Sequence, residues 1–126
     1  MKIRFSAPND LEVAGSAAEL SAIAQQVSQL EAPERFTVSA ETNFDPAPYA
    51  ECLPTLTFAA GSGPVLVLAD ASGMRIAGSQ QHLRSFASFL TFADGEVGTH
   101  AHFEYYTDNS FIAPESTPLV ITCLPG

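Results

Sequence analysis

Basic residues, cysteines and long apolar runs are all scarce in this sequence of 126 residues. No run of about 18 apolar residues occurs, so we expect no transmembrane helix. Residues Met1–Ser6 alternate between polar and apolar and lack the apolar segment of a signal peptide. With 5 Lys and Arg against 14 Asp and Glu, the net charge is −9. Such a surface repels phosphate backbones and anionic lipid, so we expect neither nucleic acid nor membrane as a partner, whereas a basic protein is attracted.

The two cysteines, Cys52 and Cys123, show neither metal-site spacing nor a Cys-x-x-Cys pair. This pattern favours two ordinary thiols in a cytoplasmic protein. The apolar share, 46%, is normal for a globular protein. The chain is long enough for one core and too short for two independent domains, so we expect residues 1–126 to form a single domain without a cofactor.

An internal repeat relates residues 1–63 to residues 64–126. The segment Leu11–Ser16 (LEVAGS) recurs as Met74–Ser79 (MRIAGS), 63 positions later, which is half of the chain length. The same offset matches apolar positions from end to end. We therefore predict a tandem duplication of a ββαββ unit.

Each half of the chain shows the same order of elements. Two strands come first, followed by Ser16 or Ser79, whose hydroxyl is suited to accept from the free amides at the start of a helix. Apolar residues at i, i+3, i+4 and i+7 then predict a helix with one buried stripe. The two stripes are Leu20, Ile23, Ala24 and Val27, and Leu83, Phe86, Ala87 and Leu90. The other predicted strands are Ile3–Ser6, Phe36–Glu41 and Thr55–Ala59, then Val65–Ala69, Thr99–Tyr105 and Leu119–Cys123.

Two such units with one shared core predict an α+β fold of about eight mainly antiparallel strands and two helices on a common sheet. A duplicated domain of this kind resembles a single sliding-clamp domain. Clamps line their DNA channel with basic helices, whereas here the first helix carries no Lys or Arg and the second carries only Arg84. The likeness is therefore expected in architecture and not in function.

The segment His100-Ala-His102-Phe-Glu104 places two imidazoles and a carboxylate on one face of a predicted strand, since alternate residues share a face. Such a set can supply the three protein ligands of an open zinc site. The alternative is a polar face exposed to solvent. We favour the exposed face, because the offset of 63 puts polar residues without histidine in the first half at Thr37, Ser39 and Glu41.

No other catalytic pattern is present. Neither cysteine has a His at a recognisable spacing, there is no Gly-x-Ser-x-Gly elbow, and Gly61-Ser-Gly63 lies between strands and is typical of a turn. We therefore predict that the protein is not an enzyme. The alternative is a small metal-dependent enzyme or binder that uses His100, His102 and Glu104.

Two long connections precede the last strand of each half, Thr42–Pro54 and Tyr106–Pro118. Hairpin loops usually have about two to five residues, and longer loops tend to be functional. Aromatics among polar groups are common interface anchors, although these rings can equally fold back over the ends of the sheet. The candidate partner-binding residues are Phe44, Asp45, Tyr49 and Glu51 in the first loop, and Tyr106, Asp108, Phe111 and Glu115 in the second.

The two predicted helices differ outside the shared stripe. Gln26 and Gln29 of the first correspond to Phe89 and Phe92 of the second. In helical geometry these rings make the second helix apolar over most of its circumference. Either another element covers Phe89 and Phe92, or they form a contact with a protein partner or in a homodimer; we favour the contact.

The His100-Ala-His102-Phe-Glu104 motif, followed by Ser116-Thr-Pro-Leu-Val-Ile121, resembles the bacterial immunity-protein family 32. That family has a strand, a Gly-x-x-x-x-Leu helix, a His-x-His-apolar-Glu strand and a final Leu-Val-Ile strand, and residues 73–124 fit this order. The resemblance implies an antitoxin-like protein that binds and neutralises a cognate toxin in the bacterial cytoplasm. It supplies no catalytic residues; its motif positions here are His100, His102 and Glu104.

These observations together predict a non-enzymatic protein-binding module, most simply an immunity-type inhibitor of a basic protein partner. Its expected contact surfaces are the two long loops and the second helix. The alternatives are the metal-dependent protein described above and a self-associating structural protein that uses Phe89 and Phe92.

Overall fold

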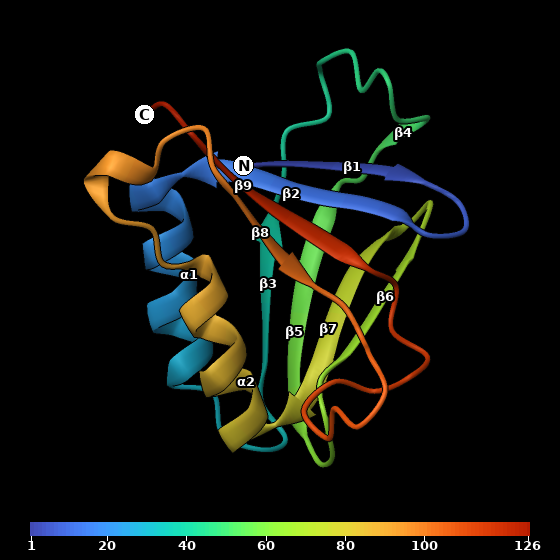
Figure 1. Ribbon diagram of the computed structural model, residues 1–126, viewed down its shortest axis with the longest axis vertical. Helices are drawn as coiled ribbons and strands as arrows, with labels where there is room; N and C mark the ends of the chain where they lie inside the picture. Colours follow the sequence, from blue (N-terminus) through green and yellow to red (C-terminus); the bar gives the residue numbers. More distant parts are fainter.

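The computed structural model describes residues 1–126, apart from the side chain of Asp94. Within this range the chain forms two α-helices and nine strands (Figure 1). In order, the elements are β1 (Lys2–Ser6), β2 (Asp10–Ser16), α1 (Ala17–Ser28), β3 (Arg35–Ser39), β4 (Glu51–Cys52), β5 (Thr55–Gly61), β6 (Leu66–Asp70), β7 (Gly73–Ser79), α2 (Gln80–Ala87), the 3-10 helices η1 (Ser88–Leu90) and η2 (Asp94–Glu96), β8 (His100–Phe103) and β9 (Leu119–Leu124).

The strands form two mixed sheets, so the α+β class is confirmed and the expected common sheet is wrong. Sheet A has the order β4-β1-β2-β9-β8, and sheet B has the order β3-β5-β7-β6. At the centre of each sheet a strand from one half of the chain pairs in parallel with a strand from the other, β2 with β9 and β5 with β7. The neighbouring pairs are antiparallel. In Figure 1 the central strands of sheet A lie across those of sheet B.

The registers of the two central pairs are related by the same offset as the sequence repeat. Val13 lies opposite Ile121 in sheet A. The residues 63 positions away, Ile76 and Phe58, lie opposite each other in sheet B. The two pairs that join the halves thus have matching registers, and each sheet contains strands from both halves. The tandem duplication itself stays a prediction.

The outer pairs correct the alignment used for the histidine strand. His100 lies opposite Thr122, and Arg35 lies opposite Ala59, so β8 corresponds to β3 with an offset of 65 (100 − 35). His102 therefore corresponds to Thr37 and not to Ser39. A shift of two residues keeps the same face of the strand, because side chains alternate with a period of two.

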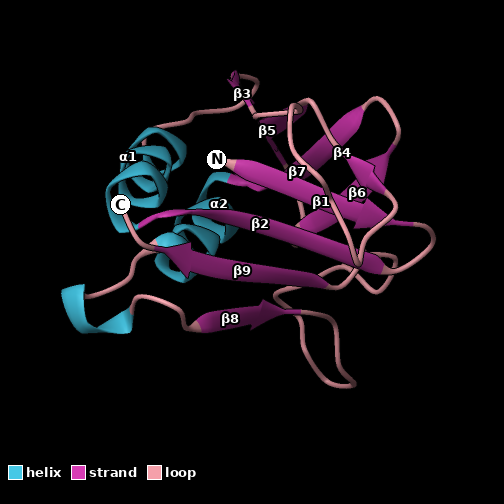
Figure 2. Cartoon of the chain, turned by 90° about the horizontal axis from the view of Figure 1, so that it is seen from above, coloured by secondary structure: helices cyan, strands magenta, loops and turns pink.

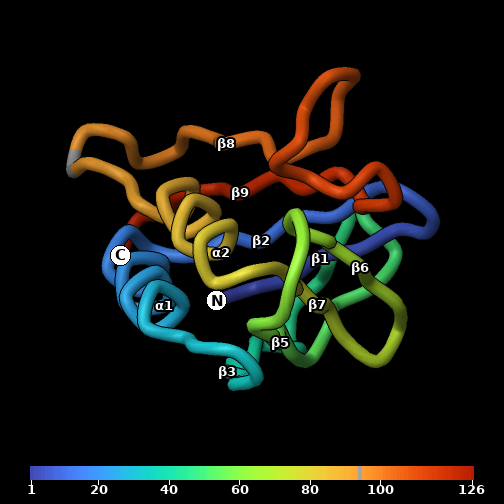
Figure 3. The backbone as a smooth tube through the Cα atoms, turned by 90° about the horizontal axis from the view of Figure 1, so that it is seen from below, coloured from blue at the N-terminus to red at the C-terminus, as the bar shows by residue number. Residues whose placement is uncertain are grey.

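Both helices begin where the sequence predicts. Ser16 accepts from the backbone N–H of Glu19 at 3.1 Å, and Ser79 accepts from that of His82 at 3.1 Å. The predicted stripe of α1 is buried throughout. The helix α2 is shorter than expected and ends at Ala87, so Leu90 of its predicted stripe lies in η1, where it is still buried. Figure 3 shows α1 and α2 side by side.

The core lies between the inner faces of the two sheets and the paired helices (Figure 2). Alternate residues of each strand point into it, as the period-two pattern predicts. Both cysteines are free thiols, Cys123 buried and Cys52 half-buried. None of the described helices has the length and apolarity that crossing a membrane requires. The largest core side chains are Phe58, Phe86, Phe103, Ile3, Leu11, Leu20, Leu53, Leu56, Met74, Ile76, Leu83 and Leu90.

Candidate functional site

The His-x-His motif lies on β8, an edge strand of sheet A. His100, His102 and Glu104 are exposed, whereas Phe103, which lies between His102 and Glu104, is buried. The predicted alternation of side chains between the two faces of the strand is therefore confirmed. His100 Nδ1 lies 2.9 Å from the Thr122 hydroxyl, which donates to Glu12 Oε2 at 2.9 Å. Because this hydroxyl uses its proton on Glu12, it acts as an acceptor toward His100.

The geometry of β8 does not favour a metal centre. Among the side chains that the structure describes, no group of three His, Cys, Asp or Glu is placed to hold a metal ion. His100 is engaged by Thr122, whereas His102 and Glu104 line depressions farther along the strand. The exposed polar face is the alternative that the arrangement supports.

A buried carboxylate on the same outer face of sheet A was missed by sequence reasoning. Glu12 is only 6% exposed. It accepts from Arg4 Nε at 2.7 Å and from Thr122, and the Arg4 guanidinium lies over the Tyr49 ring, 4.5 Å from its centroid. The signal was available in the sequence, because an antiparallel hairpin over residues 2–16 places Arg4 directly opposite Glu12.

The first long loop folds back over this face. Lys2 Nζ lies 5.1 Å from the Phe44 ring centroid, and Tyr49 covers Arg4. Partial burial raises the pKa of Tyr49, and the nearby Glu12 carboxylate adds to the rise. Glu51 lies in β4, opposite Phe5, while Asp45 accepts from the backbone N–H of Ala47 at 3.0 Å. The rings of this loop therefore pack mainly on their own sheet.

The second long loop covers the free edge of β6. The backbone N–H groups of Ala113 and Thr117 donate to the carbonyls of Val65 and Val67 at 2.7 and 2.8 Å. Such cover protects an edge strand from pairing with another chain. Asp108 and Glu115 stay exposed, with Asp108 in a left-handed turn at φ 72°.

An aromatic cluster joins the second loop to the segment after α2. Phe103 makes edge-to-face contacts with Phe89 at 5.1 Å and with Phe111 at 5.9 Å between ring centroids. Because α2 ends at Ala87, the expectation that Phe89 and Phe92 extend the apolar face of a helix is wrong. Phe89 lies in η1, and β8 partly covers it.

A depression of about 520 Å³ opens beside this cluster. We call it the β8 groove; it is lined by Phe89, His102, Phe103, Glu104, Tyr106, Asn109, Phe111 and Ile112. Tyr106 is 67% exposed and is the most exposed large ring of the described residues. Five residues predicted from three separate patterns meet here: Phe89 from the helix, His102 and Glu104 from the motif, and Tyr106 and Phe111 from the loop.

His102 and Glu104 also line a second, smaller depression of about 180 Å³, together with Tyr49 and Asp10. The two depressions share these two side chains. The structure thus brings one ring of the first loop toward the motif strand. Of the other predicted site residues, Phe44 and Asp45 line a third depression with His100, while Phe92, Asp108, Glu115 and Glu51 line none of these three.

Residues 73–124 match the model of the family Immunity protein 32. This confirms, over the second half of the chain, the resemblance that the motif indicates. All residues of the β8 groove lie within the matched range. Neither the curated proteins nor the solved structures contain a match to the chain.

Proposed function

We propose that this chain is a non-enzymatic protein-binding module of the immunity type, which neutralises a cognate bacterial toxin by binding it through the β8 groove. The observation that carries the proposal is the position of the groove. It brings together two of the three motif side chains, His102 and Glu104, and an exposed tyrosine inside the range that matches the immunity-protein family.

The chemistry of the groove suits a protein partner. Four aromatic side chains line it, and His102, Glu104 and Asn109 add polar groups to the lining. Protein interfaces commonly combine an aromatic centre with a polar rim. Tyr49, which lines the smaller depression with His102 and Glu104, extends the proposed surface to the first loop.

Charge points to a basic partner. The net charge of −9 favours encounter with a positively charged protein, and opposite fields raise the association rate in a salt-dependent way. We place this interaction in the bacterial cytoplasm, in keeping with two free thiols. Phe44, Asp45, Glu51, Phe92, Asp108 and Glu115 remain proposed contributors at the periphery of the interface.

We also propose that the chain is one domain that arose by duplication of a ββαββ unit. The matching registers of the two parallel strand pairs support this origin. The likeness to a sliding-clamp domain is a proposal about architecture alone.

The function is tested by capturing partners with the tagged full chain and then expressing the captured protein alone and together with this chain. We expect one protein in stoichiometric amount, arrest of growth when it is expressed alone, and rescue on co-expression. Association should slow as salt rises. A captured protein that is harmless when expressed alone, or whose toxicity persists on co-expression, contradicts the proposal.

A further inference from the structure

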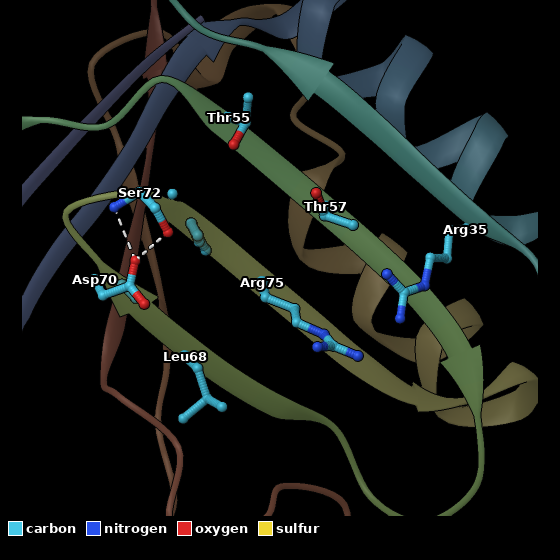
Figure 4. Close-up of a pocket in the computed structure, with 10 residues that line it drawn as sticks. Arg35, Thr55, Thr57, Leu68, Asp70, Ser72 and Arg75 are labelled. Carbon is cyan, nitrogen blue, oxygen red and sulfur yellow. Dashed lines mark hydrogen bonds between the residues drawn. The ribbon is translucent and has the colours of Figure 1, made fainter.

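The outer face of sheet B carries a second polar surface, which shares no lining residue with the β8 groove. A depression of about 390 Å³ opens there between the strands (Figure 4). We call it the sheet B face and define it by Arg35, Thr55, Thr57, Leu68, Asp70 and Arg75. The register places Thr57, Arg75 and Leu68 in one row across β5, β7 and β6.

The two arginines of this face differ from the other Lys and Arg residues of the chain in their side-chain contacts. Of the 5 Lys and Arg residues, Lys2 covers a phenylalanine ring, Arg4 pairs with Glu12 and Arg84 donates to the Ser28 carbonyl at 3.0 Å. Arg35 and Arg75 have neither an ion pair nor a side-chain hydrogen bond with the residues that the structure describes. Two guanidinium groups are therefore available on one face of a strongly acidic protein.

Asp70 is the acidic residue that lines this face, and it is already engaged. Its Oδ1 accepts from the backbone N–H of Ser72 at 2.8 Å and from the Ser72 hydroxyl (Figure 4). Both hydrogen bonds lower the pKa of Asp70, and the one from the Ser72 hydroxyl has the larger effect. The carboxylate is held in its turn and leaves Arg75 without a partner in the described part of the chain.

The equivalent face of sheet A shows what kind of group such a surface accepts. There a carboxylate, Glu12, neutralises Arg4, and the acidic, aromatic first loop covers the pair. By the offset of 63 residues, Arg75 of β7 corresponds to Glu12 of β2. Sheet B therefore has a cation at the position where sheet A has the carboxylate that neutralises Arg4. The second long loop lies along the β6 edge, and the sheet B face stays open.

We propose that the sheet B face binds an extended acidic segment of another protein, whose carboxylates engage Arg35 and Arg75 and whose apolar side chain packs on Leu68. Guanidinium forks match carboxylates in a bidentate way. Leu68, 44% exposed, offers the apolar contact, and Thr55 and Thr57 add polar groups to the same face, the Thr57 hydroxyl being already hydrogen-bonded to that of Thr37 at 3.1 Å. A nucleic acid is a poorer fit, because its continuous row of phosphates meets the net charge of −9.

The spacing of the arginines suits a segment with more than one carboxylate. Arg35 and Arg75 are two strands apart and offset by two residues along the strands. Sheet geometry converts this into about 10 Å across and about 7 Å along the sheet. The proposal is independent of the toxin assignment, because it concerns a different sheet and a different ligand charge.

The test uses the full chain labelled for NMR and a short capped peptide of alternating glutamate and leucine. We expect shifts confined to the arginine Nε–H groups of Arg35 and Arg75 and to amides around Leu68. Arg75→Gln and Arg35→Gln should each weaken binding by about tenfold or more, as loss of one charge-assisted contact predicts. Arg84→Gln is the matched control, since it removes one positive charge away from this face and should leave affinity within about twofold.

Three outcomes would overturn the proposal. One is an equal loss of affinity in Arg84→Gln, which would indicate net charge alone. Another is a lack of selectivity for the acidic peptide: a lysine–leucine peptide binds equally well, or a single-stranded RNA or inorganic phosphate binds more tightly. The third is a set of shifts that maps to the β8 groove. Failure here leaves the proposed function untouched, because capture of a toxin through the β8 groove involves none of these residues.

Discussion

Tyr106 combines a large ring, high exposure and a position at the rim of an aromatic groove. A ring that is 67% exposed contributes little to folding, and the proposed function assigns this ring to contact with the partner. Tyr105, next to it in the chain, is 38% exposed and does not line the groove. The two tyrosines therefore form a matched pair for separating binding from stability.

Tyr106→Ala should weaken association with the captured partner by roughly 2 kcal/mol, the range of an interface hot spot. Tyr105→Ala should change it by less than about 0.5 kcal/mol. Isothermal titration calorimetry measures both, and urea unfolding checks that neither variant changes stability by more than about 0.5 kcal/mol. Equal effects of the two variants on affinity would place the interface elsewhere.

Glu12 is a residue whose removal should be felt in folding instead. Glu12→Ala leaves the half-buried Arg4 without its carboxylate and the Thr122 hydroxyl without its acceptor. Breaking a buried pair costs about 3–5 kcal/mol, and the partial exposure of Arg4 reduces the expected loss in unfolding free energy to about 2–3 kcal/mol. Urea unfolding of Glu12→Ala and of the exposed control Glu115→Ala measures it, with the control within about 0.5 kcal/mol. A double variant that also carries Arg4→Ala should lose less than the sum of the two single losses.

At the scale of elements, the start of α1 gives a pH-dependent prediction. Glu19 accepts from the N-terminal amine at 2.8 Å and from the Ser16 backbone N–H at 3.0 Å. These two hydrogen bonds, in that order, lower the pKa of Glu19 below its ordinary 4.5. A carboxyl with a lowered pKa stabilises the fold fully above its unfolded pKa, and this contribution disappears as pH falls through the lower, folded value.

Glu19→Gln keeps the acceptor for the capping box but removes the charge. The stability difference between wild type and Glu19→Gln should be small, below about 1 kcal/mol for a half-exposed group, at neutral pH. It should shrink as pH falls below 4.5. Urea unfolding across pH 3 to 7 measures the trend. A difference that grows on acidification would contradict the assigned hydrogen bonds.

The helices were predicted better than the sheets, and α1 shows why. The serine caps and the stripe of Leu20, Ile23, Ala24 and Val27 depend on residues a few positions apart, so the sequence carries them locally. The end of α2 at Ala87 was not signalled, because Ser88 and Phe89 continue an acceptable helical pattern; η1 instead turns Phe89 toward Phe103. The division into two sheets depends on which strands pair across the two halves, β2 with β9 and β5 with β7, and alternation does not name the partner of a strand.

The candidate site was predicted residue by residue but not as an assembly. Loop length singled out Tyr106 and Phe111, helical spacing singled out Phe89, and strand alternation singled out His102. Their meeting in one groove follows from the aromatic contacts of Phe103, which no local pattern contains. Asn109 and Ile112 were missed because nothing in their spacing distinguishes them.

At the scale of the whole molecule, the exchange of strands makes each half depend on the other. Both sheets have a parallel pair at their centre that joins the two halves, and α1 packs on α2. Residues 1–63 alone retain one helix, the β1–β2 pair with β4, and the β3–β5 pair. Such small sheets, each stripped of its central partner, bury too little apolar surface for independent stability.

We therefore expect residues 1–63 and residues 64–126, each produced separately, to lack dispersed amide signals in NMR spectra. When mixed in equal amounts they should regain the spectrum of the full chain, because the two parallel pairs and the shared core form an interface larger than either half buries alone. The recovery should depend on protein concentration, as association of two chains requires. The cut follows Gly63, in the exposed bend after β5, so the break itself disturbs little of the core. A half that folds by itself would show that the strand exchange is not what holds this fold together.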